Sequence, residues 1–353
     1  MQSPYEGLGP EAFWRTGVVS RSADDIPFLY RPKFPIDRSL NIATAGSCFA
    51  QHIARHLRLR GFSVIDTEPP PKFVPADVAA RFGYGIYSAR YGNIYTARQL
   101  KQLFLEVFGR FTPGDAVWEK DGRFYDALRP GVEPNGLSSP EVVAEHRSHH
   151  LGQIRKILAG FDVLVFTLGL TEAWVHRDSG TVYPTAPGTI AGRFDPAEYE
   201  FRNFTFREIY EDLVTTFEGL RGIKPQLRLL LTVSPVPLTA TASGQHVLCA
   251  TTYSKSVLRA VAGQLCQEYA DIDYFPAYEI VTSPLANGRF FEDNLRTVGS
   301  PGVEAVMKTF FAAHDPAPVE HVTKEAPIGA EPDDVTVDEQ VICEEAMLDA
   351  FAG

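Results

Sequence analysis

Cysteine is scarce in this chain, and the few cysteines present are not arranged as a set. The four are Cys48, Cys249, Cys266 and Cys343. Their spacing lacks the pairs typical of zinc sites and does not indicate a disulfide framework. A run of about 18 apolar residues, which would cross a bilayer, is also missing, and the N-terminus lacks the basic and apolar regions of a secretory signal. We therefore expect a protein of a reducing compartment, most simply the cytoplasm, with no membrane association.

Positive charge is sparse too, but the deficit is local. The 353 residues include 33 basic and 44 acidic side chains, and residues 315–353 hold 11 of the acidic ones and one basic one, Lys324. The rest of the chain is nearly neutral and lacks the positive field that nucleic-acid binding needs. The acidic segment is predicted to be a mostly disordered tail that aids solubility, with a short amphipathic helix over 341–351. Recruitment of a protein partner by this tail is the alternative.

Signatures of bound cofactors and metals are missing as well. The chain contains neither G-x-G-x-x-G nor a P-loop, so we predict no cofactor. His146 and His150 have the i, i+4 spacing of two metal ligands on a helix. No third ligand is indicated, so a solvated helix face is the better interpretation and no metal site is predicted.

The chain does have a regular alternation of apolar strands and helices. Strands are predicted at 40–45, 62–66, 162–169, 227–235 and 272–281, and helices at 49–60, 141–159, 205–220, 252–270 and 302–311. Near-continuous apolar strands separated by helices indicate a parallel sheet covered on both faces. Residues 84–140, with the hairpin-like "AVWEKDGRFYDAL", interrupt this pattern as an insertion after the second strand. A single α/β domain over 1–314 is therefore predicted.

Polar side chains gather directly after the predicted strands. They are Ser47 and Cys48, then Thr171, Glu172 and Trp174, then Ser234 and His246, and finally Asp293 and Arg296. The carboxyl ends of parallel strands meet at one edge of a sheet, where ligands bind. We therefore predict a functional site at this edge.

Five segments together resemble the GSCFA-domain family, which is grouped with the SGNH (GDSL-like) hydrolases. They are "TAGSCFAQHI", "YGNIYTARQL", "TLGLTEAW", "LTVSPVPLTAT" and "ATTYSKSVLRAVAG". The resemblance covers nearly the whole chain, from about Phe13 to the last helix. It implies a flavodoxin-like three-layer α/β/α sandwich. It also implies an acyl-ester hydrolase or acyltransferase acting on a glycan or a small acylated metabolite.

The resemblance suggests where a nucleophile would stand. Laid over G-D-S-L in the same frame, "GSCF" places Cys48 at the nucleophile and Ser47 at the aspartate. A thiol at a helix N-terminus is favoured as thiolate by the helix dipole, and Ser47 would then be the N-cap. A shift of one residue makes Ser47 the nucleophile, and a purely structural turn is the third alternative.

The remaining family positions match only in part. The resemblance implies an oxyanion hole in which Gly92, with Asn93 beside it, supplies one donor. Thr171 stands where the family has Asn, and its hydroxyl can still donate one hydrogen bond. Glu172 has no counterpart and is interpreted either as a base or substrate ligand or as a rim carboxylate. Trp174 is a candidate substrate contact.

The histidine that serves as general base in these hydrolases is replaced here. "EDNLRT" keeps Asp293 but has Arg296 at the histidine position, and arginine does not lose its proton. A cysteine nucleophile needs a base less than a serine does, which favours Cys48. His246 is the first candidate for a substitute base.

The arginine at the histidine position also favours a second class of function, ligand binding without catalysis. Arg129 and Arg296 are candidates for binding a phosphate or carboxylate through their guanidinium groups, with ordinary salt bridges as the alternative. A non-catalytic protein that holds an anionic ligand at the strand ends therefore stays open beside the enzyme.

Overall fold

A five-stranded parallel sheet forms the centre of the protein. The computed structural model describes residues 3–315, 341 and 343–352. The strands are β1 (Asn41–Gly46), β2 (Ser63–Val64), β5 (Val163–Leu168), β9 (Arg228–Val233) and β10 (Ile272–Tyr274), in the spatial order β10–β9–β5–β1–β2. Counted along the chain, this is the flavodoxin-like order 2-1-3-4-5. The predicted α/β class with a parallel sheet is confirmed.

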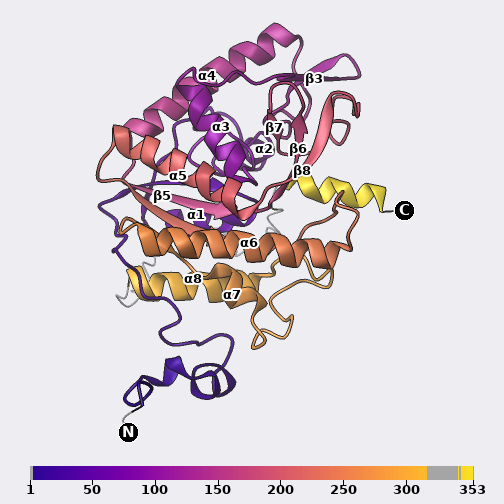
Figure 1. The fold of residues 1–353 in the computed structure, drawn as a ribbon. Helices are drawn as coiled ribbons and strands as arrows, with labels where there is room; N and C mark the ends of the chain where they lie inside the picture. The colour runs from indigo at the N-terminus through magenta and orange to yellow at the C-terminus, as the bar shows by residue number, and fades with distance from the viewer. Residues whose placement is uncertain (1–2, 316–340, 342, 353) are drawn as a thin grey trace, which may run out of the picture.

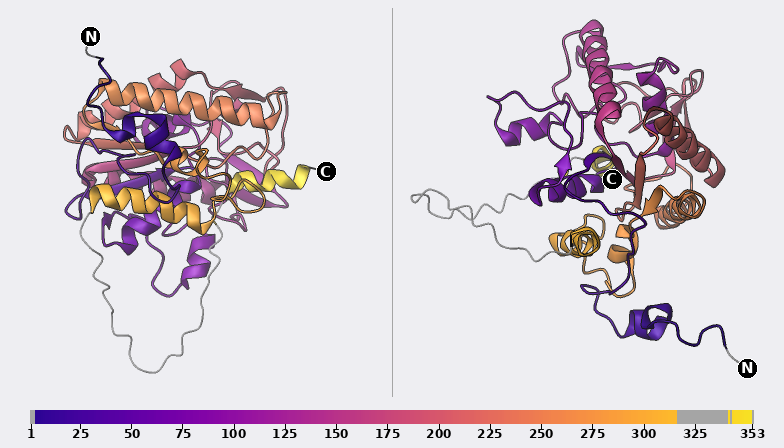
Figure 2. Two further views of the ribbon diagram at one scale, coloured as in Figure 1. Left: turned by 90° about the horizontal axis from the view of Figure 1, so that it is seen from below. Right: turned by 90° about the vertical axis from the view of Figure 1, so that its left-hand side faces the viewer.

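Helices cover both faces of the sheet, as the left view of Figure 2 shows for α6 (orange) and α8 (gold) on opposite sides. One face carries α1 (Phe49–Leu59), α7 (Ala277–Thr282) and α8 (Ser300–His314). The other carries α3 (Ala97–Val107), α4 (Pro140–Gly160), α5 (Phe206–Ile223) and α6 (Val247–Glu268). Neighbouring strand residues alternate between the two cores, since Val165 packs on the α1 side and Phe166 on the α5 side.

Two small antiparallel sheets extend this framework. The predicted hairpin is present as β3 (Val117–Lys120) and β4 (Arg123–Asp126). The second sheet joins β7 (Val182–Tyr183), β6 (Glu172–His176) and β8 (Tyr199–Asn203). The sequence pattern did not predict the second sheet, because its strands are short and it is stabilised by aromatic packing across the insertion: Trp118 of β3 lies against Tyr183 of β7.

Two expectations about local structure were wrong. The strand predicted over 272–281 ends at Tyr274, because Pro276 cannot continue a ladder and instead caps α7. The histidine-rich face of α4 is not solvated at His150, which is fully buried and hydrogen-bonded to Glu68 at 2.7 Å. It belongs to the apolar stripe of α4, in register with Ile154 and Ile157.

Short elements complete the chain. They are α2 (Ala76–Arg81) and, near the N-terminus, η1 (Pro10–Ala12) and η2 (Arg15–Val19). The helix expected near the C-terminus is present as η3 (Glu344–Phe351), a 3-10 helix. Figures 1 and 2 show η3 near the opposite end of the sheet from the C-terminal end of α8. Most of the predicted disordered tail lies outside the described residues. Among the described helices, none is both long and apolar enough to span a bilayer.

Candidate active site

The candidate site lies where β1 and β5 end, which is the point at which the strand order reverses. Gly46, the last residue of β1, has a φ of 136°, and a Cβ there would lie 2.5 Å from the carbonyl oxygen of Thr167. Only glycine permits this approach. The amide of Ser47 then donates to the same carbonyl oxygen at 3.0 Å. The turn that carries Ser47 and Cys48 is therefore pressed against β5.

The two candidate nucleophiles differ in what their side chains meet. Ser47 and Cys48 are both buried, with exposed fractions of 2% and 4%. Ser47 Oγ has no hydrogen-bond partner among the described residues, and its Cβ lies against Gly169. The Cys48 thiol, by contrast, has the Cys343 thiol as its neighbour. Cys48 thus lies beside the C-terminal segment, whereas Ser47 packs against the residue that follows β5.

The expectation that Ser47 caps α1 was wrong. The N-cap of α1 is Cys48, and its side chain makes no capping hydrogen bond. Ser47 Oγ accepts no amide of the first turn, because the amides of Ala50 and Gln51 donate instead to the backbone carbonyls of Ser47 and Cys48.

The C-terminal segment Cys343–Glu345 lies beside the ends of β1 and β5, against Asn93, Tyr95 and Arg296. We call this place the crevice. The carboxylate of Glu344 accepts hydrogen bonds from Asn93 Nδ2 and from Tyr95 Oη, the latter at 2.9 Å. Arg296 Nη2 lies 3.4 Å from the carboxylate of Glu345. Both glutamates are buried, with exposed fractions of 3% and 7%. Two buried carboxylates are therefore held beside the end of β1 by side chains from separate parts of the chain.

Asn93 is oriented to donate to Glu344. Its Oδ1 accepts hydrogen bonds from Tyr87 Oη at 2.6 Å and from Gln51 Nε2 at 3.2 Å, which turns the amide nitrogen toward the carboxylate. Gly92 is adjacent, and a Cβ there would lie 3.6 Å from Glu344 Oε1. The structure thus brings the predicted residues Gly92 and Asn93 to one carboxylate.

The two thiols are unequal in this arrangement. The pKa of Cys343 is well below its ordinary value, because the neighbouring Cys48 thiol, Arg296 and Tyr95 stabilise its thiolate. Arg296 Nη2 lies 3.8 Å and Tyr95 Oη 3.7 Å from Cys343 Sγ. The pKa of Cys48 is raised by the same contact with Cys343 and by burial. With the segment docked, the negative charge therefore rests on Cys343.

Lys255 is a site residue that sequence reasoning missed. It is 1% exposed, and its Nζ donates to the carbonyl of Gly169 at 2.7 Å. Burial lowers its pKa to about 8, while Glu345 and Cys48 act in the opposite direction. Lys255 lies on the same buried stripe of α6 as Leu258 and Ala262, and a lysine within an apolar stripe was the available signal.

Thr171 and Trp174, two of the predicted site residues after β5, contact residues outside the crevice. Thr171 begins the extension into β6, and its hydroxyl donates to Asn203 Oδ1 at 2.7 Å, so its proton is not available to an oxyanion. Trp174 packs on Phe194 and Phe201, with ring centroids 5.0 and 5.9 Å apart.

Glu172, the first residue of β6, lies closer to the occupied crevice. It is buried, and its Oε1 accepts a hydrogen bond from Thr241 Oγ1 at 2.9 Å. Burial raises the pKa of Glu172, and its charge acts on Glu345.

The predicted base and its orienting aspartate are not brought to Cys48. His246 is exposed and caps α6, where its Nδ1 accepts from the amide of Leu248 at 3.2 Å. Within the described part of the chain it makes no hydrogen bond to either candidate nucleophile. Asp293 is exposed, and the described carboxylate that pairs with Arg296 is Glu345.

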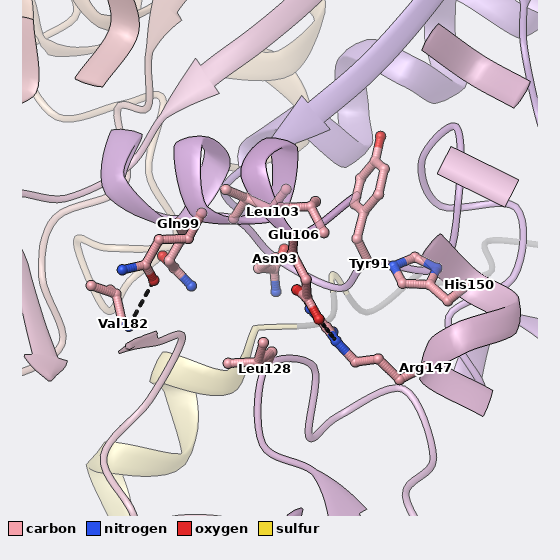
Figure 3. Close-up of a pocket in the computed structure, with 11 residues that line it drawn as sticks. Tyr91, Asn93, Gln99, Leu103, Glu106, Leu128, Arg147, His150 and Val182 are labelled. Carbon is pink, nitrogen blue, oxygen red and sulfur yellow. Dashed lines mark hydrogen bonds and ion pairs between the residues drawn. The ribbon is translucent and has the colours of Figure 1, made fainter. Parts of the chain in front are cut away.

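Arg129 lies outside the crevice and has a structural environment. Its Nε pairs with Asp126 at 2.7 Å and its Nη1 donates to the carbonyl of Arg90 at 3.0 Å. A separate cavity of about 30 Å³ is lined by Asn93 and walled by Tyr91, His150 and the Glu106–Arg147 ion pair (Figure 3). It has room for water but not for a substrate. The described residues contain no group of three or more histidine, cysteine or acidic side chains arranged to hold a metal ion.

The parallel sheet, its strand-end crevice and the thiol at the end of β1 define an α/β protein with a site at the topological switch point. The GSCFA family model matches residues 41–310, and the chain belongs to the GSCFA family. No curated protein matches the sequence.

Two solved structures are similar to the chain over most of its length. One is a family 3 carbohydrate esterase of Clostridium thermocellum, with 9% identity, a TM-score of 0.33, and coverage of 77% of this chain and 94% of that one. The other is the periplasmic domain of a lipopolysaccharide acetyltransferase of Salmonella ser. Paratyphi A, with 13% identity, a TM-score of 0.26, and coverage of 74% and 94%. Likenesses this weak carry no argument about activity.

Proposed function

We propose that this protein is a thiol-dependent, SGNH-like acyl-ester hydrolase or acyltransferase that acts on a glycan or a small acylated metabolite. The observation that carries the proposal is the carboxylate of Glu344, which Asn93 and Tyr95 hold in the crevice beside Cys48. A carboxylate is the group that hydrolysis of an ester releases. Donors that bind it are suited to the oxyanion that precedes it.

Cys48 is the nucleophile in this proposal. Its thiolate attacks the acyl carbon, the ester oxygen leaves as an alcohol, and water or an acceptor hydroxyl then cleaves the thioester. Ser47 is the weaker candidate, because its hydroxyl is buried and lacks a described partner that would accept its proton.

Lys255 takes the place of the missing histidine base. A buried amine with a pKa of about 8 is partly neutral at neutral pH, and its charge interacts with Cys48. It accepts the thiol proton and returns it to the leaving alcohol. Asn93 Nδ2 and Tyr95 Oη stabilise the developing oxyanion, a role for which Thr171 has no free proton.

A non-catalytic anion-binding protein is the second candidate. It is favoured by Arg296, whose guanidinium lies against the Glu345 carboxylate instead of supplying a base. In this alternative the crevice binds a carboxylate-bearing ligand, and Cys48 only lines it.

Acylation of the full-length protein by p-nitrophenyl acetate separates the candidates. We expect a burst of p-nitrophenol and one acetyl group on Cys48, detected by mass spectrometry of peptides. Cys48→Ala should abolish both, whereas Ser47→Ala and the matched control Cys249→Ala should keep them, since Cys249 is exposed outside the site. An adduct on Ser47 would move the nucleophile by one residue. Absence of any adduct, with thermal stabilisation by acetate that Arg296→Met removes, would establish the binding protein.

A further inference from the structure

Two cysteines that are almost 300 residues apart in the chain meet in the crevice. Cys48 stands at the start of α1, and Cys343 immediately precedes η3, where Tyr95 and Arg296 hold it as the neighbour of the Cys48 thiol. Both are free thiols in the structure. Cys48 is buried, whereas Cys343 is partly exposed. A reagent in solution therefore reaches Cys343 first.

The contact rests on a built docking site. Tyr95 Oη touches both Cys343 Sγ and the Glu344 carboxylate, and Arg296 Nη2 touches both Cys343 Sγ and the Glu345 carboxylate. Two side chains from distant parts of the chain thus each contact two residues of the segment. This arrangement fixes Cys343 over Cys48.

We propose that Cys48 and Cys343 form a reversible disulfide when the protein meets a small-molecule disulfide, and that this bond fastens the C-terminal segment across the crevice. Formation of the bond depends only on the two thiols. Its consequence, a closed site that no ester can enter, rests on the proposed function.

The exchange proceeds in two steps. The Cys343 thiolate attacks one sulfur of oxidised glutathione, forming a mixed disulfide and releasing one glutathione thiolate, which takes a proton from water. The Cys48 thiol then attacks Cys343 Sγ, forming the internal disulfide, while its proton leaves with the second glutathione. The two cysteines lose two electrons and glutathione disulfide gains them.

The remaining cysteines supply an internal contrast. Cys249 is exposed, and the described structure places no second thiol beside it, so it should stop at the mixed disulfide. Cys266 is partly buried, and burial raises its pKa to about 11, so it should react slowest. Of the four cysteines, only the pair in the crevice combines a partly exposed thiol of lowered pKa with a second thiol beside it.

The test treats the full-length protein with oxidised glutathione, blocks the remaining thiols with N-ethylmaleimide, and maps peptides by mass spectrometry. We expect a peptide that links Cys48 to Cys343, lighter by two hydrogens and released by dithiothreitol. Cys48→Ser should instead trap glutathione on Cys343, because the second step is lost. Cys249→Ser is the matched control and should leave the link unchanged.

The possible results distinguish failure of the disulfide proposal from failure of the proposed function. Free Cys48 and Cys343 in a protein whose Cys249 carries glutathione would overturn the proposal, as would a link from either cysteine to Cys249. Melting curves of each variant identify any loss of folding, and the wild-type peptide map needs no variant at all. Acylation of Cys48 without a cross-link would refute only this inference. A cross-link without acylation would refute only the proposed function.

Discussion

Two clusters of buried charged residues in this protein differ in how far apart their members lie in the sequence. The first, which we call the core cluster, comprises Glu106, Asp126, Arg129 and Arg147. The second, the crevice cluster, comprises Cys48, Lys255, Arg296, Cys343, Glu344 and Glu345. The core cluster is assembled from residues within about 40 positions of one another, whereas the crevice cluster needs a segment from the far end of the chain.

The pKa values show what this difference means. Burial alone would raise the pKa of Asp126, but the charges of Arg147 and Arg129 outweigh it and hold the pKa at about 2. In the crevice, burial and the neighbouring Cys343 raise the pKa of Glu345 to about 8 despite Arg296 and Lys255. In the core cluster, the positive charges of two arginines balance the two carboxylates, and these ion pairs stabilise the fold. In the crevice cluster, the charges are poorly balanced and the pKa values are strongly shifted, as is common at functional sites.

The largest expected effect is on the core cluster. Arg147→Met leaves the carboxylate of Glu106 without its buried partner and Asp126 with Arg129 alone, so the free energy of unfolding should fall by about 3–5 kcal/mol. Glu345→Gln in the crevice should lower it by less than about 1 kcal/mol, because the segment can undock without unfolding the sheet. Urea denaturation measures both. Equal losses would erase the distinction between the clusters.

A smaller effect is expected on access to the crevice. Replacing both Glu344 and Glu345 by alanine removes the carboxylates that anchor the segment, so docking should weaken by at least about 1.4 kcal/mol. Iodoacetamide should then alkylate Cys48 roughly tenfold faster, as measured by timed quenching and peptide mass spectrometry. Cys249 is the control in the same molecule. An unchanged rate at Cys48 would mean that the segment does not shield it.

The smallest effect concerns pH. Burial lowers the pKa of His150 to about 3, helped by Arg129 and opposed by Glu68. Between about pH 6.5 and 3 the unfolded chain therefore binds a proton at His150 that the folded protein does not. The free energy of unfolding falls as the pH falls through this range, by at most about 1.4 kcal/mol per pH unit. His52 and His314, whose pKa values burial lowers to about 4, act in the same direction. His150→Gln should reduce the slope by one proton's contribution, measured by urea denaturation from pH 6.5 to 4.5. An unchanged slope would show that His150 is not held neutral.

The framework around the site could be predicted because it depends on local apolar patterns. A helix was expected over 49–60 after the first strand, and its apolar residues Phe49, Ile53 and Leu57 are buried together on one face. The strand-end location of the site followed from the parallel order of the strands. These features depend on spacing along short stretches, which a single sequence displays.

The contents of the crevice could not be predicted in the same way. Glu344 and Glu345 lie in a segment whose acidic composition resembles a solvated tail, and their partners Asn93 and Arg296 are distant in sequence. Polar contacts over such distances leave no periodic pattern. His246 was expected near Cys48 from its place after β9, but the loop directs its ring to the start of α6 instead.

Because Cys343 belongs to the same molecule as Cys48, the segment acts as a tethered competitor. Only 27 residues separate it from Asp315, at the end of α8. Tethers of this kind give local concentrations on the order of millimolar, so even a weakly binding segment would occupy the crevice most of the time. A substrate present at micromolar levels would therefore have to bind roughly a thousandfold more tightly than the segment to displace it.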